Sequence, residues 1–339
     1  MRAVFKNEEY FRAYIGERQS ILLSNKDTIL DDEMNNKWLK VQNCLYKEQI
    51  LIAKYSLGAS LKEIQSLYSD TIDSIFENWN SEIVKFKMGQ KVFDSLYVYH
   101  HDSMLRLISI GVLFDATEEL TKLRDKLSEL NITNRLFDKL INYIIPSHNI
   151  TSDSDSHCPT AFNKFEKLVF SDSLDDKKLV RFQNSWYPTL NKNYFVWKDT
   201  HLNRGKGYFG YWSFSVAAIA KINSLSSEKL LSNIFFPTDM LLRSNSIYVY
   251  QTSNELKLLK RIDELISKMG GIRRSTNDIL SLRKDILKMK KPKFENIEIS
   301  VNSYIQWLKD RYTHEVPLVD LMPYFERIEF VMIELNNSR

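Results

Sequence analysis

Helix-breaking residues and cysteines are scarce in this chain of 339 residues. Glycine occurs 9 times and proline 7 times, where average usage would give roughly 24 and 17. This scarcity excludes a collagen-like chain and a turn-rich all-β architecture. The two cysteines, Cys44 and Cys158, are too few for a disulfide framework or a four-thiolate zinc site, so a reducing compartment is expected.

Long apolar segments are also missing. The N-terminus, MRAVFKNEEYFRAY, places charges every few residues, whereas a signal peptide needs an uninterrupted apolar stretch. The longest uncharged apolar-rich stretch, between Lys206 and Lys221, is shorter than the roughly 20 residues that a membrane span requires. We therefore expect a cytoplasmic protein without a membrane segment.

Charge is distributed unevenly between the two halves of the chain. Residues 1–160 hold 19 basic and 23 acidic side chains, and residues 161–339 hold 28 and 20. Within the second half, residues 255–293 carry 12 basic and 5 acidic side chains. No aromatic residue interrupts this block before Phe294, so the stacking groups of a single-strand binder are missing. A solvated or partner-facing helix is favoured, and no direct contact with nucleic acid is expected.

Apolar spacing predicts an all-α fold, a multi-helix bundle of antiparallel amphipathic helices. One helix should begin near the acidic residues 31–33 and end at Gly58, and the next should begin at the capping box Ser60-x-x-Glu63. A third helix is expected from about Asp94 to Leu113, and another from Tyr208 to Asn223.

Turn chemistry between Pro146 and Pro159 suggests a domain boundary. The expected organisation is an N-terminal helical domain at 1–150, a C-terminal helical domain at 160–245 and an additional helical region at 250–339. The stretch from Ser246 to Gln251 has strand-like composition, but no partner strand is visible.

No complete catalytic constellation is present. The chain has no phosphate-binding glycine loop, no G-x-S-x-G and no H-E-x-x-H. The best lead is His100-His101-Asp102, because an adjacent His-Asp pair is central to one class of metal-dependent phosphohydrolases, but that class needs a histidine upstream and His100 is the first in the chain. We expect no catalytic, metal or cofactor site. An α-helical metal-dependent phosphohydrolase and a nucleic-acid-binding regulator using residues 255–293 remain as alternatives.

The densest aromatic segment runs from Gly207 to Lys221 and is more typical of a core than of a site. Its run YFGYWSFSVAAIAK, with the upstream W-x-D-x-H that starts at Trp197 and the downstream FFPTDML, resembles the C-terminal domain of the PoNi family, the immunity proteins of polymorphic nuclease effectors. The stretch LIAKYSLGASLKEIQSLYSDTID is similar to that family's N-terminal domain, and residues 104–114 resemble the helix that follows. The family usually carries an acidic residue where this chain has Ser215.

The resemblance, over about residues 5–242, implies an all-helical, non-enzymatic cytoplasmic protein. It would protect its producer in interbacterial competition by binding a cognate DNase toxin delivered by a secretion system. An inhibitor needs a shaped surface with complementary charge rather than catalytic groups. The candidate contact residues on polar helix faces are Asp70, Asp73, Glu77 and Glu82. Second-tier candidates lie around the aromatic segment: Asp199, His201, Tyr208 and Asp239.

Overall fold

The computed structural model describes residues 1–26, 28, 30, 32–146, 151–152, 157–171, 173–202 and 207–242. All of them fall within one compact unit, Met1–Tyr248. The expected helical region at 250–339, its basic block at 255–293 and the uncertain strand at 246–251 lie outside the described residues.

The described elements confirm the all-α prediction, with one small hairpin added. In the first half they are α1 (Glu8–Lys26), α2 (Glu33–Leu57), α3 (Leu61–Asn78), α4 (Ser81–Val84), β1 (Lys85–Met88), β2 (Lys91–Leu96), α5 (Val98–Phe114), α6 (Thr117–Glu129) and α7 (Arg135–Ile144). In the second half they are α8 (Asn163–Val169), α9 (Asp176–Thr189), α10 (Phe214–Ile222), α11 (Glu228–Leu231) and α12 (Thr238–Leu242), with 3-10 turns at Thr160–Phe162 and Thr200–Leu202.

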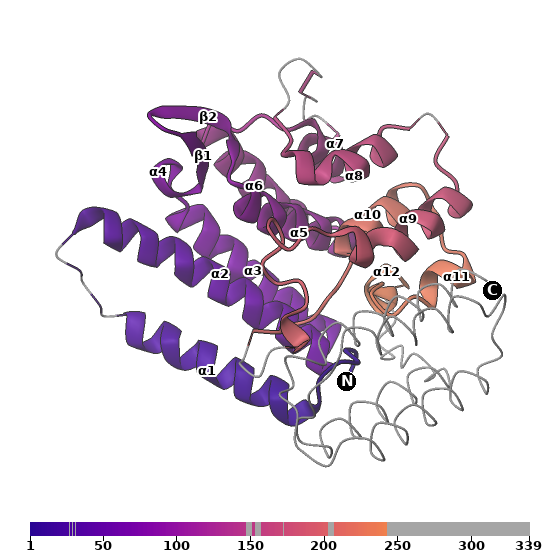
Figure 1. The fold of residues 1–339 in the computed structure, drawn as a ribbon, viewed down its shortest axis with the longest axis horizontal. Helices are drawn as coiled ribbons and strands as arrows, with labels where there is room; N and C mark the ends of the chain where they lie inside the picture. The colour runs from indigo at the N-terminus through magenta and orange to yellow at the C-terminus, as the bar shows by residue number, and fades with distance from the viewer. Residues whose placement is uncertain are drawn as a thin grey trace, which may run out of the picture. The chain divides into compact units, whose positions relative to one another are not determined.

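Helix α2 begins and ends where the sequence predicts, and α3 begins where the sequence predicts. The Asp32 carboxylate accepts hydrogen bonds from the first amides of α2, and Gly58 ends that helix with φ of 110°. The Ser60 hydroxyl then accepts a bond from the amide of Glu63 and caps α3. Because helices joined by so short a turn run antiparallel, α2 and α3 pack side by side (Figure 1).

The predicted start of the third helix at Asp94 is wrong. Residues 85–96 form the antiparallel hairpin β1–β2, with Gly89 in its turn, and α5 begins only at Val98. The rings of Phe86 and Phe93 pack 5.2 Å apart across the two strands. Such cross-strand aromatic pairing stabilises a hairpin. The helix prediction considered only the spacing of apolar residues along the chain and therefore missed this pairing.

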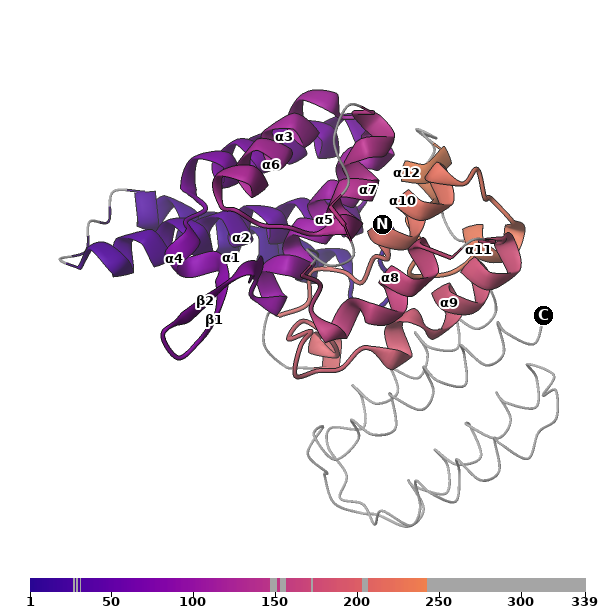
Figure 2. The same ribbon diagram turned by 90° about the horizontal axis from the view of Figure 1, so that it is seen from above.

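Helix α5 is the centre of the fold. Every residue from His100 to Leu113 is buried, and the helix packs against α3, α6, α7, α10 and α12. Figures 1 and 2 both show it enclosed by elements from the two halves of the chain. A helix buried on all sides is usually apolar all round, but α5 also carries polar residues that need partners in the interior.

The histidine pair of α5 lies in this interior. His100 packs on Trp79 with ring centroids 5.5 Å apart, and His101 packs between Phe137 and Phe162 at 4.6 and 4.2 Å. Burial lowers the pKa of His100 to about 4 and that of His101 to about 3. Both imidazoles are therefore neutral at physiological pH.

The predicted helix from Tyr208 starts too early. Residues 207–213 are not helical, and α10 begins at Phe214. Gly210 has φ of 126°, and a Cβ atom there would collide with the Ser56 hydroxyl. That hydroxyl donates to the Phe209 carbonyl oxygen and accepts from Trp212 Nε1, both at 2.8 Å. A close approach of the two backbones thus replaces the first turns of the expected helix.

Gly111 tests the close packing around α5. A Cβ atom at this position would collide with the Tyr68 hydroxyl and lie 2.7 Å from Leu120 Cδ2. We expect Gly111→Ala to lower the free energy of unfolding by about 1–3 kcal/mol through overpacking. Gly16, in α1, has nothing within 4 Å, so Gly16→Ala should instead add about 0.5–1 kcal/mol. Urea denaturation measures both values, and equal effects of the two substitutions would contradict this packing.

His101 should make stability depend on pH. Its pKa is about 3 in the folded protein and about 6.5 in an unfolded chain. Below about pH 6.5 the unfolded chain gains a proton that the folded chain does not bind, so stability falls with decreasing pH. His101 alone should lower the free energy of unfolding by about 2 kcal/mol between pH 7 and pH 5.

Denaturation of His101→Gln at the two pH values checks this expectation. The variant should lose that part of the pH dependence, whereas a control substitution of the exposed His157 with glutamine should keep it. Acidic groups are common to all three proteins and cancel in the comparison. An unchanged pH dependence in His101→Gln would show that His101 is not held neutral.

Candidate functional site

Carboxylates gather on the solvent side of α3 and α6, which pack against each other. Five exposed ones define what we call the acidic face: Asp70, Asp73, Glu77, Glu118 and Glu129. Two lysines lie among them. Lys122 bridges the two helices, with its Nζ 2.7 Å from Asp73 Oδ1 and 3.0 Å from Glu118 Oε1. The structure therefore brings three of the predicted contact residues onto one surface.

The carboxylates of Asp70 and Glu77, in α3, have no hydrogen bond or ion pair with another described residue. Both carboxylates are exposed, so their charges face solvent without a countercharge in contact. Asp73 is partly neutralised by Lys122. The acidic face thus carries a net negative charge that a basic partner can meet.

An exposed aromatic ring lies beside these carboxylates. Phe76 is 40% exposed, and Lys126 Nζ sits 5.4 Å from its ring centroid while pairing with Glu129 at 2.8 Å. Sequence reasoning did not single out Phe76, because it falls among the apolar residues that form the buried stripe of α3. Aromatic anchors surrounded by polar rims are typical hot spots of protein interfaces.

Glu82 lies on α4 and pairs with α2, so it is not counted in the acidic face defined above. Its Oε2 pairs with Lys37 Nζ at 2.7 Å, and the hydrogen bond from Lys37 lowers the pKa of Glu82. The pair lies at the surface, with Glu82 exposed and Lys37 partly exposed, so it contributes little to stability. The next residue of α2, Trp38, is 53% exposed.

Asp239 is buried and joins distant parts of the chain. Its carboxylate accepts hydrogen bonds from Arg2 Nε and from the Tyr55 hydroxyl. Arg2 Nη1 also donates to the carbonyl oxygens of Tyr55 and Ala59, at 2.9 and 2.7 Å, where α2 ends. The carboxylate therefore fastens the N-terminus and α2 to α12.

Asp199, His201 and Tyr208 lie in the aromatic interior. Asp199 accepts from the Tyr187 hydroxyl at 2.7 Å and pairs with Lys192 Nζ at 2.6 Å. His201 Nδ1 is 2.8 Å from the Tyr211 hydroxyl, and the amide of Tyr208 donates to the Tyr10 hydroxyl at 2.9 Å. The structure shows an interior bonding role for these groups, and their contribution to partner binding stays a prediction.

A buried ion triad joins α5 to α2, and it was not predicted from the sequence. Arg106 donates through Nε to Glu48 Oε1 at 2.8 Å and through Nη1 to Asp102 Oδ2. Trp197 Nε1 donates to the same Asp102 oxygen at 2.7 Å, and the Ser103 hydroxyl donates to Glu48 Oε2. Burial raises the pKa of Asp102, while Arg106 and Trp197 oppose that shift. Asp102 of the histidine motif is thus part of a buried ion pair.

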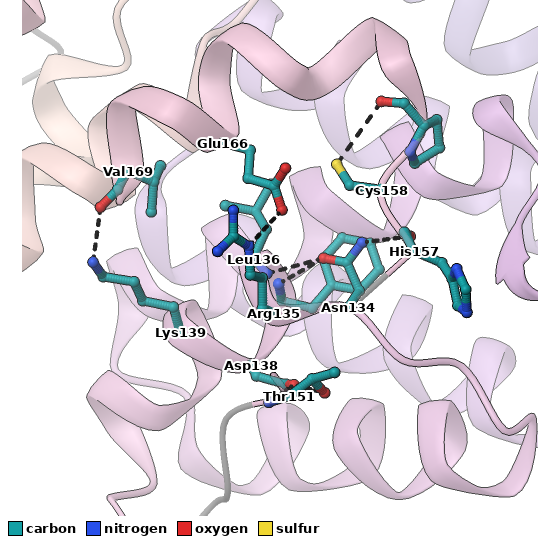
Figure 3. A network of polar contacts seen from close by, with 12 residues as sticks. Asn134, Arg135, Leu136, Asp138, Lys139, Thr151, His157, Cys158, Glu166 and Val169 are labelled. Carbon is teal, nitrogen blue, oxygen red and sulfur yellow. Dashed lines mark hydrogen bonds and ion pairs between the residues drawn. The ribbon is translucent and has the colours of Figure 1, made fainter. Parts of the chain in front are cut away.

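The segment between the two halves of the chain is tied to α7 by polar contacts (Figure 3). Asn134 Oδ1 caps α7 by accepting from the amides of Leu136 and Phe137, both at 3.1 Å, and its Nδ2 donates to the His157 carbonyl oxygen at 3.0 Å. Arg135 Nε and Lys139 Nζ then reach α8, as Figure 3 shows, bonding Glu166 and the Val169 carbonyl oxygen. These bonds connect α7 to the start of the second half.

The described residues contain neither a membrane-spanning helix nor a cluster of metal-binding side chains. No helix among them is long and apolar enough to cross a membrane. Within the same residues, no three histidine, cysteine, aspartate or glutamate side chains are grouped so that they could hold a metal ion.

Comparison with known proteins identifies two matching family domains. Residues 2–124 match the family described as PoNe immunity protein (PoNi), N-terminal, and residues 132–240 match PoNe immunity proteins (PoNi), C-terminal. No curated protein matches the chain. Among solved structures, the chain resembles the crystal structure of protein PA2201 from Pseudomonas aeruginosa at 17% identity and a TM-score of 0.53, covering 71% of this chain and 90% of that one.

The PA2201 match shows a shared fold. The two family domains follow each other in the order of the family and extend from residue 2 to residue 240, the region where the sequence motifs resemble PoNi. The chain therefore belongs to the PoNi family, the immunity proteins for PoNe nuclease effectors.

Proposed function

We propose that this protein acts in the cytoplasm as a non-catalytic inhibitor that binds a PoNe-type DNase directly and covers its DNA-binding surface. The observation that carries the proposal is the acidic face, where Asp70 and Glu77 present unpaired charge beside the exposed ring of Phe76. Family membership supports the nuclease as the partner.

Charge complementarity supports this choice of surface. A nuclease neutralises DNA phosphates with lysine and arginine side chains, so its DNA-binding surface is positive. A negative surface on the inhibitor attracts it over a distance, raises the association rate and competes with DNA for the same groups. Phe76 would then supply apolar burial that slows dissociation.

The buried second-tier candidates have a different expected role. Asp199 and Asp239 are 5% and 2% exposed, so a partner cannot reach their carboxylates without displacing interior bonds. We expect substitutions there to act on binding through the fold. The exposed carboxylates Asp70, Asp73, Glu77 and Glu82 are the proposed direct contacts.

Charge reversal on the acidic face tests the proposal. The double variant Asp70→Lys and Glu77→Lys should associate about tenfold more slowly with the purified nuclease domain of the cognate PoNe-type effector, when measured by surface plasmon resonance at low salt. The difference should nearly vanish at about 1 M salt, where the Debye length is about 3 Å. Its free energy of unfolding should stay within about 0.5 kcal/mol of the wild-type value.

A matched control carries the same charge change elsewhere. Glu9, in α1, and Glu228, in α11, are exposed, and their replacement by lysine should leave the association rate unchanged. Phe76→Ala should mainly raise the dissociation rate. If the acidic-face variant and the control bind equally fast at both salt concentrations and inhibit DNA cleavage equally, capture occurs through another surface.

We also propose the division into 1–150, 160–245 and a separable helical region at 250–339. The second of the two family domains ends at residue 240, before this last region. A chain ending at Ser244 should therefore fold, with a cooperative thermal transition and the helical circular dichroism of its remaining helices. An insoluble short chain beside a soluble full-length chain would show that residues 250–339 complete the core.

A further inference from the structure

A cavity of about 250 Å³ opens among α5, α8, α9 and the segment that leads to Trp197. Eight of its 18 lining residues are aromatic, among them Phe162, Trp186 and Trp197. Tyr194 is 39% exposed, whereas Phe162, Phe195 and Trp197 are buried, so the cavity runs from the surface into the aromatic interior. Its volume is below the range for drug-sized ligands, so it suits one side chain or a small ligand.

Two members of the ion triad, Asp102 and Arg106, also line this cavity. Both hydrogen bonds to Asp102, from Arg106 Nη1 and Trp197 Nε1, go to its Oδ2 atom. Its Oδ1 atom accepts no hydrogen bond from another described residue. A carboxylate oxygen in a cavity wall that accepts no hydrogen bond from the protein can accept one from a ligand's N–H group.

The charge of the triad favours a cation. Glu48 and Asp102 carry two negative charges against the single positive charge of Arg106, and all three side chains are buried. The other groups that contact the triad are uncharged: Tyr99, Ser103 and Trp197. Lys164, on α8, lines the cavity as a basic group, but it is exposed and therefore well screened by solvent.

We propose that this cavity binds a guanidinium group, held by Asp102 Oδ1 and stacked on the aromatic wall. A guanidinium is planar, always charged and weakly hydrated, and it both stacks on aromatic faces and forks onto carboxylates, which an ammonium ion does less well. The faces of the aromatic rings add to the negative potential of the carboxylates.

An arginine side chain of the bound nuclease is one source of this group, and a free alkylguanidine is the other. Assigning it to the nuclease rests on the proposed function, because arginine is abundant on DNA-binding surfaces. The recognition of guanidinium by the cavity stands apart from that assignment. The two are tested in separate arms.

The first arm uses small probes on the full-length protein. N-acetyl-arginine amide should change the fluorescence of the tryptophans that line the cavity and saturate at millimolar concentration, and its neutral isostere N-acetyl-citrulline amide should bind at least about tenfold more weakly. Equal binding of the two probes, or no binding of the arginine probe up to about 0.1 M, would overturn the proposal.

Variants at the mouth of the cavity locate the binding. Lys164→Glu should raise the affinity for the arginine probe about threefold. Lys167→Glu makes the same charge change at an exposed position of α8 outside the cavity lining, and it should change that affinity less than twofold. Tyr194→Ala should weaken it about threefold or more. Asp102→Asn should weaken it over tenfold, and because that variant removes a buried charge, the exposed variants remain decisive if it does not fold. Equal effects of Lys164→Glu and Lys167→Glu would place the probe outside this cavity.

The second arm uses the nuclease itself. If an arginine of the nuclease enters the cavity, Tyr194→Ala should weaken the complex about as much as it weakens the arginine probe, and excess arginine probe should compete with the nuclease. If the probe binds but the complex is unaffected, the guanidinium comes from a free small molecule. If the nuclease does not bind at all, the proposed function fails while the result of the first arm stands.

Discussion

The burial of α5 on all of its faces is the constraint on which the rest of the described structure depends. This helix contacts elements from both halves of the chain, so every polar group on it needs an interior partner. Ser109 bonds back to the Leu105 carbonyl oxygen, the histidines stay neutral between aromatic rings, and the charged pair is completed by Glu48 from α2. The residues His100, His101 and Asp102, which resemble a catalytic motif in the sequence, make core interactions in the structure.

The same constraint separates stability from recognition. Carboxylates in the interior, such as Asp239 and Glu48, are satisfied by arginine, tyrosine and serine donors and hold helices together. Carboxylates on the acidic face have fewer partners and keep charge available to a basic surface. An immunity protein can vary such an exposed face to follow its toxin without disturbing the core that α5 organises, because exposed substitutions change stability little.

The helices whose ends are set by local chemistry could be predicted from sequence. The caps at Asp32 and Ser60 and the left-handed stop at Gly58 are short-range features and lie where the pattern placed them. Features formed by contacts between distant residues could not be predicted. Gly210 lies in a non-helical segment because it packs against Ser56, more than 150 residues earlier. The hairpin likewise depends on the contact between Phe86 and Phe93.

The candidate site divides in the same way. Exposure of Asp70, Asp73 and Glu77 follows from their polar positions on an amphipathic helix, and a single sequence is enough to see it. Phe76 looks like any apolar residue of α3 until the structure leaves it uncovered. The cavity beside Asp102 requires α5, α8 and α9 to be placed around it, and the period of one helix carries no information about such an arrangement.

The central claim is that the acidic face covers the DNA-binding surface of the nuclease, and the structure of the complex tests it most directly. A crystal or cryo-electron microscopy structure of the full-length protein bound to its PoNe-type DNase should show Asp70, Glu77 and Phe76 buried against lysine and arginine side chains that otherwise contact DNA. A complex in which α3 and α6 remain exposed while the DNA-binding surface stays open would contradict the account.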